Sequence, residues 1–170
     1  MLIIVSGLPG SGKSFFARRL SAELGAEFVN SDATRRAMNA MGRYAFEDKL
    51  NVYEEMANKA GEKLREGKTV IVDATFYHHE MRDIFVTLGT LLHERMCYIE
   101  VQAEEKIIHE RLSKPRSDSE ADFAVYQQLK LQYEDPVRPR LVLQSTNENV
   151  DTMVAQALDY IKRINEGNAD

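Results

Sequence analysis

The sequence predicts a three-layer α/β fold, in which a five-stranded parallel sheet carries helices on both faces. The main observation is that short apolar segments, typical of strands, alternate along the chain with amphipathic segments typical of helices. A second is that the segments 2–5 and 69–72 are almost entirely aliphatic or β-branched. A third is that no repeat, low-complexity tract or linker interrupts the 170 residues, which favours one domain over residues 1–170.

Each expected element follows from its local pattern. Gly25 and Gly67 each follow an amphipathic segment and indicate where two of the helices end. The expected strands are 2–5, 27–30, 69–72, 95–101 and 141–143. The expected helices are 13–24, 33–41, 48–66, 80–92, 104–112, 123–133 and an amphipathic segment from Val150 to Ile164. The polar segment 113–122, which contains Pro115, is expected to be a loop.

Composition excludes several classes of protein. Hydrophobic residues make up 44% and charged residues 29%, which is typical of a globular chain. The formal net charge of −5 argues against a stable nucleic-acid binder, so nucleic acid is expected only as a substrate. No apolar run approaches the ~18 residues of a membrane span, and the N-terminal segment lacks the features of a signal peptide. We therefore expect no membrane association and a cytoplasmic location. Cys97, the one cysteine, is expected to be buried in a strand.

A phosphate-binding loop lies between the first strand and the first helix. The pattern G-x-x-x-x-G-K-[ST] is complete in Gly7, Leu8, Pro9, Gly10, Ser11, Gly12, Lys13 and Ser14. Glycines let backbone N–H groups close around phosphates, and the helix N-terminus adds partial positive charge. Lys13 is expected to reach the β- and γ-phosphates of ATP, and the Ser14 hydroxyl to bind Mg²⁺. The GTPase pattern Asn-Lys-x-Asp is absent from the sequence.

Two aspartates follow strands at the edge of the sheet where ligands bind. Asp73 ends the third strand, and it would lie beside the phosphate loop if that strand pairs with the first, as in the sheet order 2-3-1-4-5. There it would hold Mg²⁺ together with Ser14; the alternative is a turn or helix cap. Asp32 follows the second strand and is either a functional carboxylate or the N-cap of the next helix.

Basic residues beyond the phosphate loop supply candidates for stabilising a transferring phosphate. Arg111 and Arg116 flank the start of the polar loop, which indicates a lid over about 111–134. The alternative is a solvated basic turn. Arg35 follows Asp32 by three residues, and Arg82 follows Asp73 by nine. The pair His78-His79 has no partner at metal-ligand spacing in the sequence and is interpreted as loop surface.

Together these motifs resemble the small P-loop kinases grouped with bacterial and phage 5′-hydroxyl polynucleotide kinases and zeta-toxin-like kinases. The resemblance is carried by the phosphate loop and by the segments 31–35, 70–75, Arg82 and 110–116. It implies that Asp32 is the general base, that Arg35 holds an anionic group of the acceptor, and that Arg116 is the lid arginine, with Arg111 preceding it. Asp73 and Arg82 match the family's Asp-x-[ST] and following arginine, and this match implies that both bind the substrate. Phe76 and the Lys-Pro before Arg116 depart from the family pattern.

We therefore expect an ATP- and Mg²⁺-dependent phosphotransferase. Its acceptor would be a hydroxyl on a small molecule such as a nucleoside or sugar, or the 5′-hydroxyl of a nucleic acid. The alternative is an ATPase or nucleotide-gated switch that acts on a protein partner, and a third interpretation is a nucleotide-binding module without catalysis. The Asp-x-x-Arg element at Asp32 and the lid arginines favour the kinase.

Overall fold

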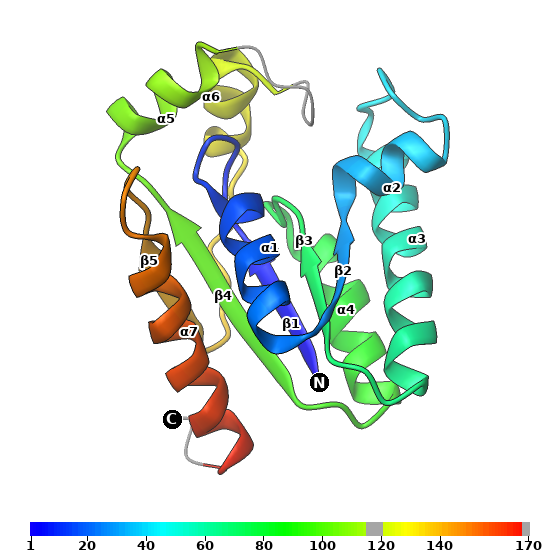
Figure 1. The fold of residues 1–170 in the computed structure, drawn as a ribbon. Coiled ribbons are helices and arrows are strands. Elements are labelled where there is room, and N and C mark those ends of the chain that lie inside the picture. Colours follow the sequence, from blue (N-terminus) through cyan, green and yellow to red (C-terminus); the bar gives the residue numbers. More distant parts are fainter. Residues whose placement is uncertain (115–120, 168–170) are drawn as a thin grey trace.

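A computed structural model describes residues 1–114 and 121–167. Its centre is a parallel five-stranded sheet in the order β2-β3-β1-β4-β5, which confirms the predicted fold and strand order (Figure 1). The register places Val5 beside Asp73 and Asp73 beside Asn30, so the carboxyl ends of β1, β2 and β3 meet at one edge. The strands are β1 (Leu2–Ser6), β2 (Glu27–Asn30), β3 (Val70–Asp73), β4 (Met96–Gln102) and β5 (Leu141–Gln144).

Helices cover both faces of the sheet. The helices are α1 (Lys13–Leu24), α2 (Ser31–Ala37), α3 (Phe46–Arg65), α4 (His79–Leu91), α5 (Glu105–Leu112), α6 (Phe123–Leu131) and α7 (Val150–Asn165). One apolar cluster joins α1 and α7 to the sheet, and a second joins α3 and α4 to the opposite face. Figure 1 shows α5 and α6 beyond the carboxyl ends of the strands, at the upper left, while α2 lies at the upper right, across the same edge of the sheet.

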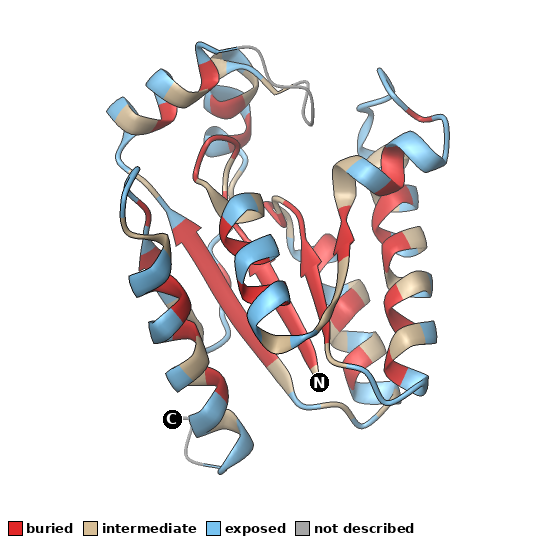
Figure 2. Cartoon of the chain, viewed as in Figure 1, coloured by how far each residue is buried: buried red, intermediate tan, exposed pale blue. Residues whose placement is uncertain are grey.

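Burial follows these layers. Figure 2 shows the three central strands β1, β3 and β4 buried along nearly all of their length, while the edge strands β2 and β5 are only partly buried and the helices are buried mainly on the face toward the sheet. Cys97 is fully buried in β4, as predicted, and this burial raises the pKa of its thiol to about 12. Within the described part of the chain, no helix is long and apolar enough to cross a bilayer.

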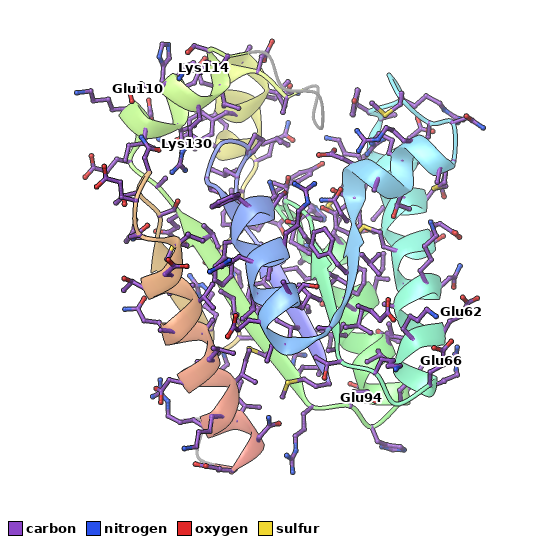
Figure 3. All side chains as sticks on the ribbon, in the orientation of Figure 1. Glu62, Glu66, Glu94, Glu110, Lys114 and Lys130 are labelled. Carbon is purple, nitrogen blue, oxygen red and sulfur yellow. The ribbon has the colours of Figure 1, made fainter. Side chains whose placement is uncertain are left out.

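The two helices α5 and α6 form a small unit with its own core. Ile108 and Leu112 of α5 pack against Tyr126 of α6. Lys130 and Glu105 join the same two helices through an ion pair of 2.5 Å, and Figure 3 labels Lys130 on this unit. We call α5, α6 and their connecting segment the lid. Residues 115–120, which include the predicted Arg116, lie outside the described residues.

The largest departure from the predicted elements is the helix after β2. We expected it over 33–41, but α2 spans Ser31–Ala37. Its early start is set by Asn30, whose side chain caps the helix through the backbone N–H of Ala33. Its early end is followed by Asn39, which has a positive φ of 53° that is incompatible with a continuing helix. The start of α2 therefore lies at the end of β2, beside Asp73.

Candidate functional site

The glycine-rich loop between β1 and α1 has the backbone that its sequence predicts. Gly10 and Gly12 have φ values of 79° and 91°, in the left-handed region that favours glycine. A side chain at Gly10 would lie 2.9 Å from Ile108 of the lid, and one at Gly12 would lie 2.8 Å from the Ser145 hydroxyl. Helix α1 begins at Lys13, directly after Gly12, so its unpaired N–H groups face the loop. This arrangement is typical of a phosphate cradle.

Asp73 lies behind this cradle and is fully buried. Its Oδ2 accepts a 2.6 Å hydrogen bond from Asn30 Nδ2, whereas Oδ1 has no hydrogen-bond partner among the described residues. Burial raises the pKa of Asp73, and the charge of Lys13 and the hydrogen bond from Asn30 oppose that rise. A buried carboxylate oxygen without a partner, next to a serine hydroxyl, fits the oxygen ligands that Mg²⁺ prefers.

Asp32 is not the helix cap that the sequence left open as an alternative. Asn30 is the N-cap of α2, and its Oδ1 accepts from Ala33 N at 2.9 Å. Asp32 lies in the first turn, where it forms no hydrogen bond or ion pair with the described residues. Its partly exposed carboxylate lines the same cavity as the phosphate loop. The side chain is therefore free to act on a ligand.

A single cavity of about 920 Å³ connects the phosphate loop to α2, α3 and the lid. Pockets that hold one drug-sized ligand are commonly between about 300 and 1,000 Å³, so this cavity is large enough for a nucleotide with a small second ligand beside it. Its lining is basic, although the chain has a net charge of −5. The charged lining residues are Lys13, Arg18, Asp32, Arg35, Lys49, Glu110, Arg111 and Lys114. Figure 3 labels Glu110 and Lys114 at the lid.

Arg111 connects the lid to the phosphate loop. Its Nη1 donates to the carbonyl of Gly10 at 3.0 Å, and its Nη2 donates to the carbonyl of Thr146 at 2.9 Å and the hydroxyl of Ser145 at 3.2 Å. A further contact of 3.2 Å joins Nε to Asn147. The guanidinium lines the cavity, and four of its five N–H donors are used in these contacts. These contacts favour a role for Arg111 in holding the nucleotide end of the site.

The end of the cavity away from the phosphate loop contains two cations. Arg35 is buried, donates to the carbonyl of Arg43 at 2.5 Å and lies 4.7 Å from the centre of the Tyr44 ring. Lys49 of α3 contacts only Tyr77, with 3.3 Å between Nζ and the phenol oxygen, and has no carboxylate partner among the described residues. Burial, and next the charge of Arg35, lower the pKa of Lys49. No sequence motif marks Lys49.

Arg82 differs from its predicted role as a substrate ligand. It does not line the cavity. Its buried Nη1 donates to the carbonyl of Phe76 at 2.7 Å and to that of Glu134 at 2.9 Å. These contacts hold the loop after β3 against the segment after α6, so Arg82 is a structural residue here and we do not propose it as a ligand. Arg116 lies outside the described residues.

His78 and His79 also differ from their interpretation as isolated loop surface. Glu134, 55 residues beyond His79, contacts both imidazole rings. A sequence gap of this size conceals the cluster, because only the return of the chain after α6 brings Glu134 to the start of α4.

Comparison with known proteins gives the family. The profile of the AAA domain family AAA_33 matches residues 2–136. Cytidylate kinase of Methanothrix thermoacetophila is 33% identical over 135 residues, which cover 74% of this chain and 77% of that protein. An uncharacterised protein of Mycobacterium tuberculosis is 28% identical over 138 residues, which cover 72% of this chain. The alignment spans only 28% of the length of that mycobacterial relative.

Solved structures share the fold at low sequence identity. An APS kinase of Mycobacterium tuberculosis, in complex with AMPPNP and APS, has a TM-score of 0.74 and 18% identity, covering 95% of this chain and 96% of that one. A gluconokinase of Sinorhizobium meliloti has a TM-score of 0.71 and 21% identity, covering 97% of this chain and 93% of that one. These similarities show a P-loop kinase-like fold.

Proposed function

Since the chain belongs to the AAA_33 family of P-loop kinases, we propose that it transfers the γ-phosphate of ATP to a hydroxyl group. The observation that carries this proposal is the cavity that joins the phosphate loop to Asp32, a carboxylate without a partner among residues 1–114 and 121–167, with room for a second ligand. An ATPase needs space only for a water molecule beside the γ-phosphate. The extra space, with its own cations Arg35 and Lys49, favours an acceptor molecule.

In this proposal the donor end consists of the phosphate loop and its neighbours. The backbone N–H groups of residues 7–14 and the Lys13 ammonium bind the β- and γ-phosphates. Ser14 and Asp73 would hold Mg²⁺, whose charge, when it is bound, offsets that of the phosphates. Asn30 fixes the Asp73 carboxylate through Oδ2 and leaves Oδ1 for that purpose. Arg111 keeps the lid against the loop at Gly10.

The transfer step needs a proton acceptor for the incoming hydroxyl. Asp32 takes that proton while the acceptor oxygen forms its bond to the γ-phosphorus, and the bond to the bridging oxygen breaks to release ADP. Arg116, from the lid, stabilises the charge on the transferring group. The predicted lid of 111–134 closes over the cavity and excludes water, which would otherwise compete with the acceptor.

The acceptor end of the cavity supports a substrate that carries a negative charge as well as a hydroxyl. Arg35 and Lys49 lie close enough for the charge of Arg35 to lower the pKa of Lys49, and no described carboxylate neutralises Lys49. Two adjacent cations are stabilised by a bound anion. Tyr44 and Tyr77, beside these cations, offer ring surface to the rest of the acceptor. Nucleoside and sugar derivatives and the 5′ end of an oligonucleotide all fit this description.

The direct test is to incubate the protein with Mg²⁺ and γ-labelled ATP and separate pools of nucleosides, nucleotides, sugars and 5′-hydroxyl oligonucleotides. We expect label on one acceptor class, and none with the Lys13→Ala variant, which lacks the phosphate-binding ammonium. Release of labelled inorganic phosphate at the same rate with and without every pool would overturn the kinase proposal in favour of an ATPase.

A further inference from the structure

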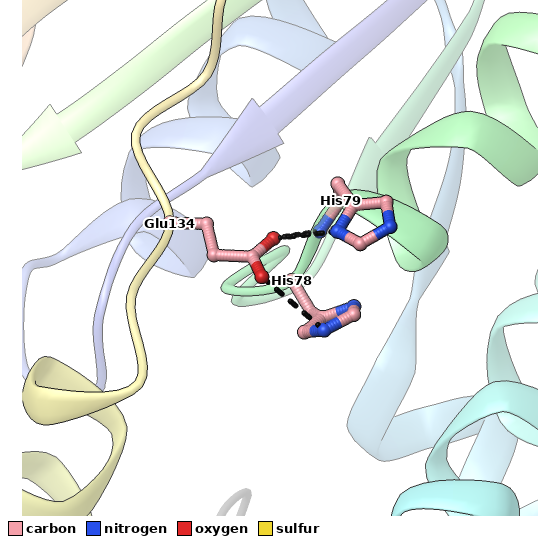
Figure 4. Close-up of side chains that lie close together, drawn as sticks. All are labelled: His78, His79 and Glu134. Carbon is pink, nitrogen blue, oxygen red and sulfur yellow. Dashed lines mark hydrogen bonds and ion pairs between the residues drawn. The ribbon is translucent and has the colours of Figure 1, made fainter.

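A second cluster of polar side chains lies outside the cavity, where the segment after α6 meets the loop after β3. It consists of His78, His79 and Glu134 (Figure 4). His79 Nδ1 lies 2.9 Å from Glu134 Oε2, and His78 Nε2 lies 3.3 Å from Glu134 Oε1. One potential ligand atom from each residue lies within 4.8 Å of the other two. None of the three residues lines the cavity of the proposed kinase site.

The protein backbone fixes the carboxylate in this cluster. Glu134 N donates to the carbonyl of Tyr77 at 2.9 Å, and His79 N donates to Glu134 Oε2 at 2.6 Å. Arg82 donates to the Glu134 carbonyl at 2.9 Å. These bonds hold the two chain segments together independently of the imidazole rings. The imidazole rings are therefore not needed to hold these two segments together.

The ligand types match those of a zinc site. Zn²⁺ binds imidazole nitrogens and carboxylate oxygens at about 2.0–2.2 Å in a tetrahedron, so its ligand atoms lie roughly 3.3–3.5 Å from one another. The two nitrogen–oxygen distances here, 2.9 and 3.3 Å, are close to that spacing. His79 is 58% exposed and has room to turn its ring toward an ion. None of the three residues in the cluster contacts the side chains proposed to hold Mg²⁺.

Metal binding has an identifiable cost at His78. Its Nδ1 accepts a long, 3.3 Å hydrogen bond from Glu80 N as the N-cap of α4. That contact places the ring proton on Nε2, which faces Glu134. Coordination through Nε2 moves the proton to Nδ1 and gives up this weak cap. In return, the ion takes the place of the protons in the hydrogen bonds between the two rings and the carboxylate. Its charge adds to that of Arg82, whose Nη2 already lies 3.7 Å from Glu134 Oε2.

We infer that His78, His79 and Glu134 form a binding site for a divalent transition-metal ion of the Zn²⁺ class, with a fourth position open to water. A bound ion ties the segment after α6 to the loop after β3. That loop also carries Tyr77, which lines the cavity at Lys49. Metal binding therefore stiffens the connection between the lid and the acceptor end.

The test measures Zn²⁺ binding to metal-stripped protein by calorimetry, and Co²⁺ binding by visible absorption, because tetrahedral Co²⁺ absorbs strongly and octahedral Co²⁺ weakly. We expect one Zn²⁺ per chain and a tetrahedral Co²⁺ spectrum, with no competition from excess Mg²⁺, which prefers oxygen ligands. His79→Ala and Glu134→Gln should each weaken binding by at least about tenfold, since even loss of an outer-shell partner costs about 10–100-fold.

His93→Asn is the matched control, because His93 is exposed, lies outside the cluster and has a positive φ of 53° that asparagine tolerates. It should bind Zn²⁺ as the wild type does. Thermal melts without metal establish that each variant is folded, and Zn²⁺ should raise the melting temperature of the wild type and the control only. Absence of Zn²⁺ binding by the folded wild type, or wild-type affinity in both cluster variants, would overturn the assignment.

Discussion

The side chain of Asn30 donates a 2.6 Å hydrogen bond to Asp73 while its carbonyl oxygen caps α2. One residue thereby orients the proposed Mg²⁺ ligand and starts the helix that carries Asp32. Because Asn30 takes the capping position, Asp32 has no structural task that the described contacts reveal. This relationship separates two roles that the sequence had left as alternatives for Asp32.

Asp32→Asn should therefore fold normally and bind Mg-ATP with near-normal affinity, yet transfer phosphate roughly 10²–10⁴-fold more slowly, because an amide cannot accept the acceptor's proton. Calorimetry measures the ATP affinity, and an assay with the identified acceptor measures the rate of phosphate transfer. Asp83→Asn, an exposed carboxylate on α4 outside the cavity, is the control and should be fully active. Wild-type transfer by Asp32→Asn would refute the general-base role.

Replacing each of the two lid arginines, Arg111 and Arg116, should change a different kinetic constant. Arg111→Ala removes the contacts to Gly10, Ser145 and Thr146, so it should mainly raise the KM for ATP and lower the melting temperature. Arg116→Ala should lower kcat far more than it raises that KM, since its contact is made in the transition state. Steady-state kinetics over ATP concentration distinguish the two. If kcat falls in the Arg111→Ala variant and not in the Arg116→Ala variant, Arg111 and not Arg116 stabilises the transferring phosphate.

Lys49→Met keeps the length of the side chain and removes its charge. We expect the KM for an anionic acceptor to rise by about tenfold, the loss of one charge-assisted contact, while the KM for ATP stays unchanged. Lys68→Met, an exposed lysine between α3 and β3, is the control. Equal effects on an anionic acceptor and its neutral analogue would contradict the proposed anion contact.

The same lysine gives a pH dependence. Burial and the charge of Arg35 hold the pKa of Lys49 below its ordinary value of 10.5, so Lys49 loses its proton at a lower pH than an exposed lysine does. As the pH is raised, Lys49 should lose its positive charge, and the KM of the wild type for the acceptor should begin to increase before pH 10.5 is reached. The profile of Lys49→Met should lack that rise; an identical rise in the variant would assign it to another group.

Gly10→Ala tests the contact between the phosphate loop and the lid. The added Cβ would lie 2.9 Å from Ile108 and 3.0 Å from Leu112, at a φ of 79°. Gly67→Ala has nearly the same φ, 75°, in open space, so it carries the backbone strain alone. We expect Gly10→Ala to be less stable than Gly67→Ala by about 1–3 kcal/mol, the usual cost of overpacking, in denaturant unfolding. If both variants lose the same free energy of unfolding, the lid moves away from the added methyl group without cost, and the tight contact is refuted.

The sequence by itself determined the strands and the phosphate loop, because these depend on local signals, whereas the strand order was expected from the resemblance to P-loop kinases and is set by tertiary pairing. An aliphatic strand, a loop of fixed glycines and an amphipathic helix are each readable within about ten residues. The positions of Asp32 and Asp73 at the ends of β2 and β3 followed from the same rule. The boundaries of the elements were less well predicted, as α2 shows. Its hydrophobic pattern covers only a few residues, so the start of the helix is set by the cap at Asn30.

Only the tertiary structure decided which of these side chains are free and which are occupied. Arg82 looked like a ligand in the sequence, but it is buried against two carbonyls that come from distant segments. No motif in the sequence distinguishes Lys49, but the packing of α3 beside Tyr77 brings it into the cavity. Glu134 meets His78 and His79 only because the chain returns after α6. Such contacts depend on how elements dock, and no local pattern encodes the distance between residues far apart in the chain.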